Sequence, residues 1–415
     1  MSTSTPRPPS NSTPTLELVS PVGVAQTWAA FRSRVSGGDL GAIPVVVGLA
    51  IIWTVFQILN PTFLSSANLV NLAMQCAALG TIALGVVLVL LLAQIDLSVG
   101  SLSGLAAAIL AVTFTQLNWP LPLAVAAALA AGALFGWFYG FLLTRFGVPS
   151  FVITLAGLLG VLGLQLWVLG RLGSINIPFD SWVVQFAQLM FLPAWLSYVL
   201  AGLATALYVG SHLSLANRRL RAGLLPESRT AILLRGGLML VALMLGAWYL
   251  NTDRGVGLMF LLFVVLVIGV DFALKRTRWG RSIYAVGGNV EAARRAGIRV
   301  DRVYISVFML SATLATLGGV LAASRLAAAN QSSGGGDTNL TAIAAAVIGG
   351  ASLFGGRGSA WSALLGIVVI QSISSGLTLL SLDSSVRYMV TGAVLLLAVI
   401  IDSLSRRSRA LHGRF

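Results

Sequence analysis

The residues best suited to chemistry gather in one segment, 275–302, which carries eight basic side chains between two long apolar runs. Within it, the stretch from Glu291 to Gly297 predicts a short helix, because alanine is the best helix former and Gly297 can take the left-handed conformation that ends a helix. Glu291 and Arg295 stand four residues apart, a spacing at which an ion pair stabilises a helix slightly. A helix with so many charges indicates a docking surface for a cytoplasmic partner. A solvated loop helix would show the same spacing.

Energy-converting chemistry is hard to place in the chain itself. A nucleotide-binding loop needs Gly-x-x-x-x-Gly-Lys-Ser/Thr, but Lys275, the only lysine, follows Ala273 and Leu274. An ion-driven relay needs acidic residues or histidines within the membrane, and only Asp96 and Asp271 come near an apolar run, each at its cytoplasmic end. Asp96 stands at a predicted helix break, where its carboxylate either caps the next helix or gates a pathway. We therefore expect neither ATP binding by such a loop nor a proton relay.

Metal and cofactor chemistry is not expected either. Cys76 is the only cysteine and lies in an apolar run, and one cysteine with His212 and His412 cannot build a metal site. The glycine-rich stretches 334–339 and 349–350 have no predicted strand before them and no lysine after them, so they indicate loops and close helix packing rather than a phosphate cradle. No catalytic cluster points to a membrane-embedded enzyme.

The elements that must position these residues are transmembrane helices. Of the 415 residues, 57% are hydrophobic and 9% charged, whereas soluble proteins average about 25% charged. A crossing helix needs about 20 mostly apolar residues, and the sequence predicts an all-α polytopic membrane protein with about ten to twelve of them. The stretch 340–354 is expected to form a short helix in the wall of a pathway. The candidate spans are 43–59, 69–93, 98–116, 121–143, 150–170, 191–210, 231–250, 256–274, 303–323, 341–356, 359–380 and 386–403.

The basic residues indicate the orientation. With both termini in the cytoplasm and alternate crossings, 22 of the 26 basic residues fall on the cytoplasmic side, in agreement with the positive-inside rule. Only Arg171, Arg254, Arg325 and Arg387 fall elsewhere. The net charge of +14 therefore indicates membrane topology, and secondly contact with anionic lipid, rather than a nucleic-acid partner.

The chain is expected to divide into three parts. Residues 1–42 predict a disordered cytoplasmic tail with a short interfacial helix, since the start of the chain is rich in Ser, Thr and Pro. Residues 43–403 form the transmembrane domain, and 404–415 a basic cytoplasmic tail. Within the domain, the predicted cytoplasmic loops are 212–229 and 275–302, and the predicted outer ones are 171–190 and 324–339.

Four motifs resemble one family of transporters. Glu291-Ala-Ala-x-x-x-Gly297 looks like the coupling loop of permease subunits of ABC importers. The stretches Ile95-Asp-Leu-Ser-Val-Gly-Ser101, Gly349-Gly-Ala-Ser-Leu-Phe-Gly-Gly-Arg-Gly-Ser359 and Leu395-Leu-Leu-Ala-Val-Ile-Ile-Asp402 resemble the monosaccharide group, the ribose, xylose, galactose and arabinose permeases. The resemblance runs from about residue 63 to residue 406. It departs from the broader importer pattern after Gly297, where no Ile-x-Leu-Pro follows, and the extra material at 191–235 looks like xylose-type members.

The resemblance implies an inner-membrane permease subunit for a monosaccharide, a pentose such as xylose, which is not an enzyme and holds no cofactor. A separate ATPase subunit would drive it, an extracytoplasmic sugar-binding protein would deliver the sugar, and two permease chains, expected to be identical, would pair. The alternative is a secondary, ion-coupled sugar transporter, which twelve spans alone would permit. The residues implied in ATPase coupling are Gly288, Asn289, Glu291, Ala292, Ala293, Arg294, Arg295 and Gly297.

A sugar pathway needs side chains that match hydroxyl groups on the inside of the bundle. Three of the candidates recur at helical spacing on one face, although hydrogen bonding between helices would equally explain such residues. The pathway residues that we predict are Asn68, Asn71, Gln75, Asp96, Ser98, Ser101, Asn339 and Gln371. The wider candidates are Gln94, Ser103, Thr154, Gln165, Asn330, Thr341, Ser372 and Ser375.

Overall fold

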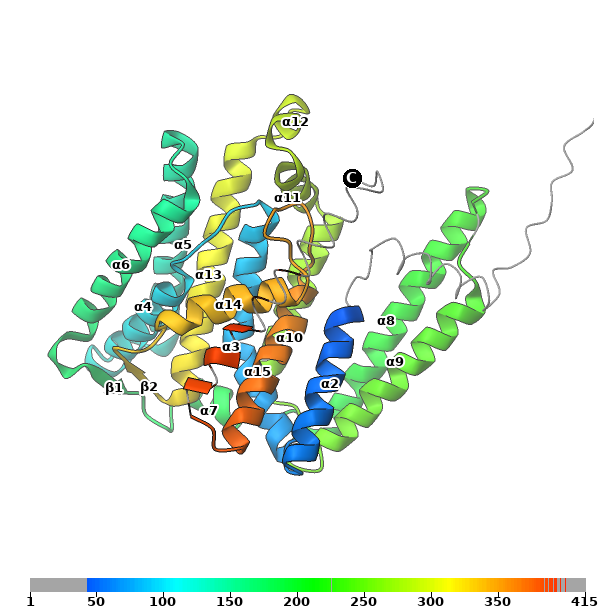
Figure 1. Ribbon diagram of the computed structural model, residues 1–415, viewed down its shortest axis with the longest axis horizontal. Helices are drawn as coiled ribbons and strands as arrows, with labels where there is room; N and C mark the ends of the chain where they lie inside the picture. Colours follow the sequence, from blue (N-terminus) through cyan, green and yellow to red (C-terminus); the bar gives the residue numbers. More distant parts are fainter. Residues whose placement is uncertain are drawn as a thin grey trace, which may run out of the picture.

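The computed structural model describes residues 43–224, 226–383, 385–386, 388–390, 392–393, 396 and 400. The predicted tails, 1–42 and 404–415, and most of the predicted span 386–403 lie outside these residues. Among the described residues, nine helices are long and apolar enough to cross a membrane, and the expected all-α polytopic fold is confirmed (Figure 1). They are α3 (Ser66–Leu91), α4 (Val99–Ala111) with its continuation η1 (Val112–Gln116), α5 (Leu121–Phe146), α6 (Ser150–Leu169) with its continuation η2 (Gly170–Leu172), α8 (Ala194–Arg221), α9 (Arg229–Leu250), α10 (Leu258–Arg276), α13 (Val300–Leu326) and α15 (Trp361–Leu379).

The remaining elements are shorter. The helices are α2 (Ile43–Leu59), α7 (Trp182–Gln188), α11 (Arg278–Gly288), α12 (Val290–Arg295) and α14 (Gly336–Ile348), and the strands are β1 (Ser174–Asn176) and β2 (Ala328–Asn330). Helices α2 and α14 are apolar, and the other short elements lie at the two ends of the bundle.

Helix α3 forms the centre of the bundle. In its most apolar 18 residues, 89% of the positions are buried, against 17% in α8 and α9. A helix that is apolar on all sides is stable only where it is surrounded by protein or lipid. Helices α13, α14, α15 and α10 pack around α3, so these helices form the core that positions any internal site.

Small residues let α5 pack closely against α13. The small, buried residues of α5 recur every four positions, which places them on one face of the helix. A methyl group on Gly136 would lie far inside 3.0 Å of the carbonyl oxygen of Phe308, so the two backbones are in contact there, as small residues allow in membranes. The buried residues of this face are Ala124, Ala128, Gly132, Gly136 and Gly140.

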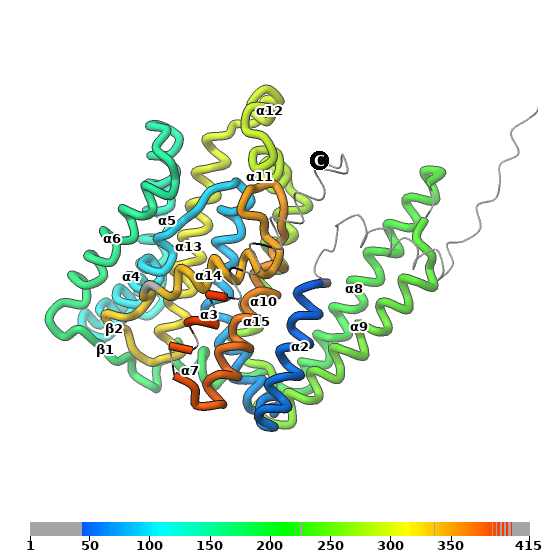
Figure 2. Tube along the Cα trace, in the orientation of Figure 1, coloured from blue at the N-terminus to red at the C-terminus, as the bar shows by residue number. Residues whose placement is uncertain are grey.

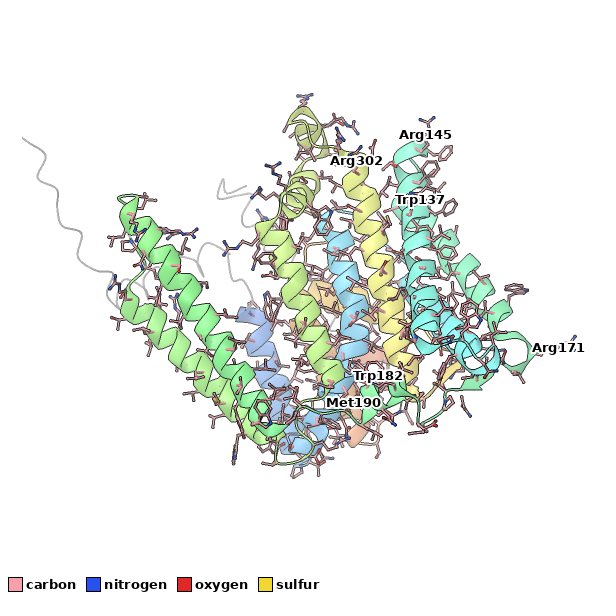
Figure 3. The ribbon with its side chains drawn as sticks, turned by 180° about the vertical axis from the view of Figure 1, so that it is seen from behind. Trp137, Arg145, Arg171, Trp182, Met190 and Arg302 are labelled. Atoms are coloured by element: carbon pink, nitrogen blue, oxygen red, sulfur yellow. The ribbon has the colours of Figure 1, made fainter. Side chains whose placement is uncertain are left out.

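Helices α8 and α9 pack on each other as a hairpin that stands to one side of the bundle (Figures 1 and 3). One end of the hairpin is tied to the start of α3, where the Tyr249 hydroxyl donates to the carbonyl of Leu64 at 2.8 Å and the Ser66 hydroxyl donates to the carbonyl of Tyr249 at 2.8 Å. Helices α2 and α15 lie side by side although far apart in sequence (Figure 2). There the indole N–H of Trp53 donates to the Ser372 hydroxyl at 2.9 Å.

The predicted loops lie at opposite ends of the bundle. Arg145 and Arg302 lie at the end that carries α11 and α12, whereas Arg171, Trp182 and Met190 lie at the other (Figure 3). The predicted outer segment 171–190 is not irregular throughout, since it contains β1 and α7. Strand β1 pairs antiparallel with β2, so the expectation that no strand precedes the glycines of 334–339 is wrong.

The predicted span 341–356 is also wrong. Helix α14 is 13 residues long, begins at Gly336 and ends at Ile348, too short to cross a membrane of about 30 Å at 1.5 Å per residue. It runs crosswise to α13 and α3 (Figure 1). Residues 349–360 form an irregular connection because their glycines include four with positive φ, at 350, 355, 356 and 358.

Candidate functional site: the coupling helices and the cavity behind them

The short helix α12 forms where the sequence predicts one. The side chain of Asn289 caps its first turn by accepting a hydrogen bond from the N–H of Ala292 at 2.9 Å, a role that asparagine performs well. The helix ends just before Gly297, whose φ of +81° is the left-handed conformation that glycine adopts beyond a helix end. In Figure 1, α12 lies beyond the ends of the long helices, so it is available to a partner.

Helix α12 has a charged outer face. The Glu291 side chain is 66% exposed and that of Arg294 60%, and Arg295 is exposed as well. The predicted Glu291–Arg295 ion pair is wrong, because Glu291 Oε1 pairs with Arg294 Nη1 at 3.2 Å. Residues three apart on a helix are neighbours as much as residues four apart, and Arg295 is left facing outward. Ala293, by contrast, is buried against the bundle.

Helix α11 attaches α12 to the bundle and was not among the predicted elements. Thr277 caps it by accepting from the N–H of Gly280 at 3.1 Å. The indole N–H of Trp279 donates to the Ser306 hydroxyl of α13 at 2.8 Å. The signal was present in the sequence, since Gly280, Ile283, Val286 and Gly287 are its buried residues and recur at helical spacing.

Tyr284 ties α11 to the connection between α14 and α15. Its hydroxyl donates to the carbonyl of Gly358 at 2.8 Å. Burial, and secondarily the negative charge of Asp271, raises the pKa of Tyr284, so the phenol stays protonated and remains a donor at neutral pH.

Three backbones meet at Gly287, near the end of α11. A methyl group there would lie 2.9 Å from the amide nitrogen of Gly356, and closer still to the carbonyl oxygen of Leu91 at the end of α3. The N–H of Gly356 donates to that same carbonyl at 2.9 Å. We call this contact of Gly287, Leu91 and Gly356 the glycine junction. It joins α11, and through it α12, directly to α3 and to the connection that leads into α15.

The linker between α3 and α4 is fixed close by. Asp96 is 1% exposed, and its Oδ1 accepts from the N–H and the hydroxyl of Ser98 at 2.8 and 2.7 Å. The N–H of Leu97 donates to the hydroxyl of Thr154 on α6 at 3.1 Å. Burial raises the pKa of Asp96, against the opposing effect of the bonds from Ser98. These bonds fix Ser98, the residue that precedes the first turn of α4, but no side chain caps that turn, so the capping interpretation of Asp96 stays a prediction.

A cavity of about 900 Å³ lies among the helices that the glycine junction reaches. Its walls come from α3, α4, α13, α14 and α15 and from the turn between β2 and α14. Many of its lining side chains are polar, which suits a hydrated or hydroxylated molecule. The polar residues among them are Gln75, Ser103, Arg325, Asn330, Ser332, Ser333, Asp337, Thr338, Thr341, Gln371, Ser374 and Tyr388.

Two of the eight predicted pathway residues, Gln75 and Gln371, line this cavity. The structure does not bring Asn68 or Asn71 to it. The Asn68 side chain accepts from the Ser375 hydroxyl at 3.0 Å, and that of Asn71 accepts from Arg254 Nη2 at 2.8 Å. Each amide is therefore occupied by a neighbour within the bundle.

The other four predicted pathway residues also make internal hydrogen bonds. Besides the Asp96–Ser98 contact, the Ser101 hydroxyl donates to the carbonyl of Leu158 at 2.9 Å, and Asn339 Oδ1 accepts from the N–H of Gly100. Of the wider candidates, Ser103, Asn330 and Thr341 line the cavity. Those that bond elsewhere are Gln94, Thr154, Gln165, Ser372 and Ser375.

Comparison with known proteins decides the family. The family described as "Branched-chain amino acid transport system / permease component" matches residues 68–399. The chain belongs to this permease family. The xylose transport system permease protein of Escherichia coli strain K12 is 37% identical to the permease over 363 residues, which cover 88% of this chain and 90% of that protein. No solved structure matches the permease.

Two further relatives have similar coverage. The xylose transport system permease protein of Haemophilus influenzae is 33% identical over 88% of this chain and 96% of its own length. The ribose import permease protein of Escherichia coli strain K12 is 31% identical over 86% of this chain and 92% of its own length. The resemblance drawn from the motifs is thus confirmed: the chain is a transport permease rather than an enzyme, and its multi-pass, inner-membrane character agrees with this membership.

Several lining residues of the permease were not predicted. Arg325 and Asp337 carry the charges of the cavity wall among the described residues. Ser332 and Ser333 lie on the turn between them, and Thr338 follows Asp337 in α14. Of these residues, Arg325 had a signal in the sequence: it is one of only four basic residues that fall outside the predicted cytoplasmic segments. In a membrane protein, such a misplaced charge often marks a pathway.

Proposed function

We propose that the permease moves a monosaccharide, a pentose such as xylose, across the inner membrane as part of an ABC importer. The observation that carries the proposal is the connection from α12 to the cavity. An exposed, charged helix is tied through α11 and the glycine junction to α3 and to the segment leading into α15, and α3 and α15 both wall the cavity. A push on α12 is thereby delivered to the walls of the pathway. The names of the relatives, xylose and ribose permeases, support a sugar as cargo.

The force would come from a separate ATPase subunit. Its contact surface would be Gly288, Asn289, Glu291, Ala292, Arg294, Arg295 and Gly297, with Ala293 holding the helix to the bundle. Because Arg294 and Arg295 outnumber Glu291 on this face, we expect the ATPase to offer an acidic or carbonyl-rich groove, which guanidinium groups engage in strong hydrogen bonds.

The remaining partners follow from the same arrangement. An extracytoplasmic sugar-binding protein would deliver the sugar at the end that carries β1 and β2, and a second copy of the permease would complete the pathway. Anionic lipid would surround the basic cytoplasmic end. Gln75 and Gln371 would contact the sugar, since the side chain of neither makes a hydrogen bond with a described residue, and the other six predicted pathway residues would hold the walls in place.

The test is reconstitution. The permease would be placed in liposomes with its ATPase subunit and binding protein, and uptake of radiolabelled D-xylose would be measured with and without ATP. We expect uptake that needs ATP and is unaffected by ionophores that collapse ion gradients. Uptake that persists without ATP but disappears with the ionophores would replace this proposal with the ion-coupled transporter.

A further inference from the structure

The cavity contains an arginine that has no protein partner among the described residues. Arg325 lies in the last turn of α13, is half-buried and lines the cavity. Its backbone carbonyl accepts from Gln188, but its guanidinium makes neither an ion pair nor a hydrogen bond with a described residue. A guanidinium has five N–H donors and no acceptor. Inside a membrane protein such an unused donor set is costly, and it is satisfied by whatever fills the cavity.

The same cavity contains one acid. Asp337 lies in the first turn of α14, lines the cavity and accepts from the Tyr388 hydroxyl at 3.5 Å. No salt bridge joins it to Arg325 in the described part of the chain. Both charges stand at helix ends that the helix dipoles favour, which explains why the fold tolerates them. It does not explain why both side chains face one cavity.

The charges of the described lining residues cancel. Arg325 and Asp337 are the only ionised groups among them, and the remaining polar groups are amides, hydroxyls and one phenol. Amides both donate and accept hydrogen bonds, as do the hydroxyl groups of a sugar. A neutral polyhydroxylated molecule can satisfy the donors of Arg325 and the acceptors of Asp337 together, whereas an anionic sugar acid would meet the Asp337 carboxylate.

We propose that Arg325 and Asp337 form a charge-balanced selectivity site in the cavity, which accepts neutral sugars and rejects sugar acids. The proposal rests on the proposed function, since it concerns the same pathway. Arg325 donates to two neighbouring hydroxyls of the sugar and Asp337 accepts from a third, while Gln75 and Gln371 complete the set. The charge discrimination resides in Asp337, because it is the group that repels a carboxylate.

Occupancy of the cavity can be read from a thiol placed in its wall. Ser374 lines the cavity and is half-buried. The native Cys76 is fully buried and should not react. Labelling of the parent protein, which lacks the new thiol, checks that Cys76 is unreactive. The purified Ser374→Cys permease in nanodiscs would be alkylated with a maleimide in the presence of D-xylose or D-xylonate. We expect D-xylose to slow alkylation and D-xylonate to have no effect.

Two variants and their matched controls then separate the roles. Asp337→Asn should allow D-xylonate to protect, and Arg325→Gln should weaken protection by D-xylose about tenfold or more, the loss expected for a charged hydrogen-bond donor. Glu227→Gln and Arg235→Gln remove an acid–base pair on the α8–α9 hairpin that does not line the cavity, and these controls should behave like the parent.

The proposal is overturned if D-xylonate protects the parent as well as D-xylose does, if neither sugar protects it, or if both cavity variants behave like the controls. In each of these cases ATP-driven uptake of D-xylose in liposomes is measured in parallel. Normal uptake would leave the proposed function standing without the selectivity site, whereas absent uptake by the assembled complex would remove the proposed function as well.

Discussion

The glycine junction makes a sharp prediction about Gly287. Adding one methyl group there, in Gly287→Ala, should disconnect α11 from the bundle. Real Cβ atoms do not approach other atoms within 3.0 Å, and this methyl group would lie 2.9 Å from the Gly356 nitrogen and nearer still to the Leu91 oxygen. Both are backbone atoms and are hydrogen-bonded to each other, so neither can turn aside as a side chain can.

The size of the effect follows from the cost of overpacking. Forcing one extra carbon into a well-packed contact costs roughly 1–3 kcal/mol, and every 1.4 kcal/mol changes an equilibrium about tenfold. The docked arrangement of α11 should therefore lose roughly 5- to 150-fold against a displaced one. Gly269 on α10 is the matched control, because a methyl group there would meet nothing within 4 Å, and its φ is not positive.

The assay is reconstituted transport with the ATPase subunit. Gly287→Ala should insert into the membrane, yet sugar uptake and sugar-stimulated ATP hydrolysis should both fall at least fivefold, the lower bound of the estimate above. Gly269→Ala should stay within about twofold of the parent, because nothing restricts its methyl group. If Gly287→Ala fails to accumulate, Tyr284→Phe tests the same connection by removing only the bond to Gly358. Equal activity of the two alanine variants, with normal transport by Tyr284→Phe, would refute the reasoning.

Three further predictions concern the partner, the orientation and the packing. Reversing both charges in Arg294→Glu/Arg295→Glu should release the ATPase subunit from the purified complex, more readily at high salt because exposed charges are screened over about 8–10 Å; retention at every salt concentration would show that these side chains face lipid. Ala285→Cys on the exposed side of α11 should resist an impermeant thiol reagent in intact cells and react in inside-out vesicles, and the reverse would invert the topology. Gly136→Val should lower the thermal unfolding temperature of the purified permease by separating α5 from α13, whereas Gly160→Ala, which meets nothing within 4 Å, should not; equal melting of the two would contradict the packing argument.

The outline of the fold could be predicted from the sequence because hydrophobicity acts locally. Nine of the twelve predicted spans are apolar helices of sufficient length among the described residues, since about 20 apolar residues must cross as a helix whatever surrounds them. The helix that contains Glu291 could be predicted for the same reason: alanines and a terminal glycine specify it without any tertiary partner. The failed span at 341–356 broke this rule, because it is short and its second half is rich in glycine.

The site depended on contacts that no local pattern contains. Asn68, Asn71 and Gln75 look equivalent in sequence, yet only Gln75 reaches the cavity, because Ser375 and Arg254 from distant segments occupy the other two. Polar side chains in a membrane bind the nearest donor or acceptor, and the packing of helices decides which one that is.

What the sequence by itself determined about this permease is its class, nine of its long apolar helices and the short charged helix α12, since these depend on composition and on neighbours along the chain. Only the tertiary structure decided that α11 touches α3 and the connection into α15 at Gly287, and that Arg325 and Asp337 line one cavity. The physical reason is distance: close approach of backbones and convergence of charges are properties of segments many residues apart, and they exist only once the helices have packed.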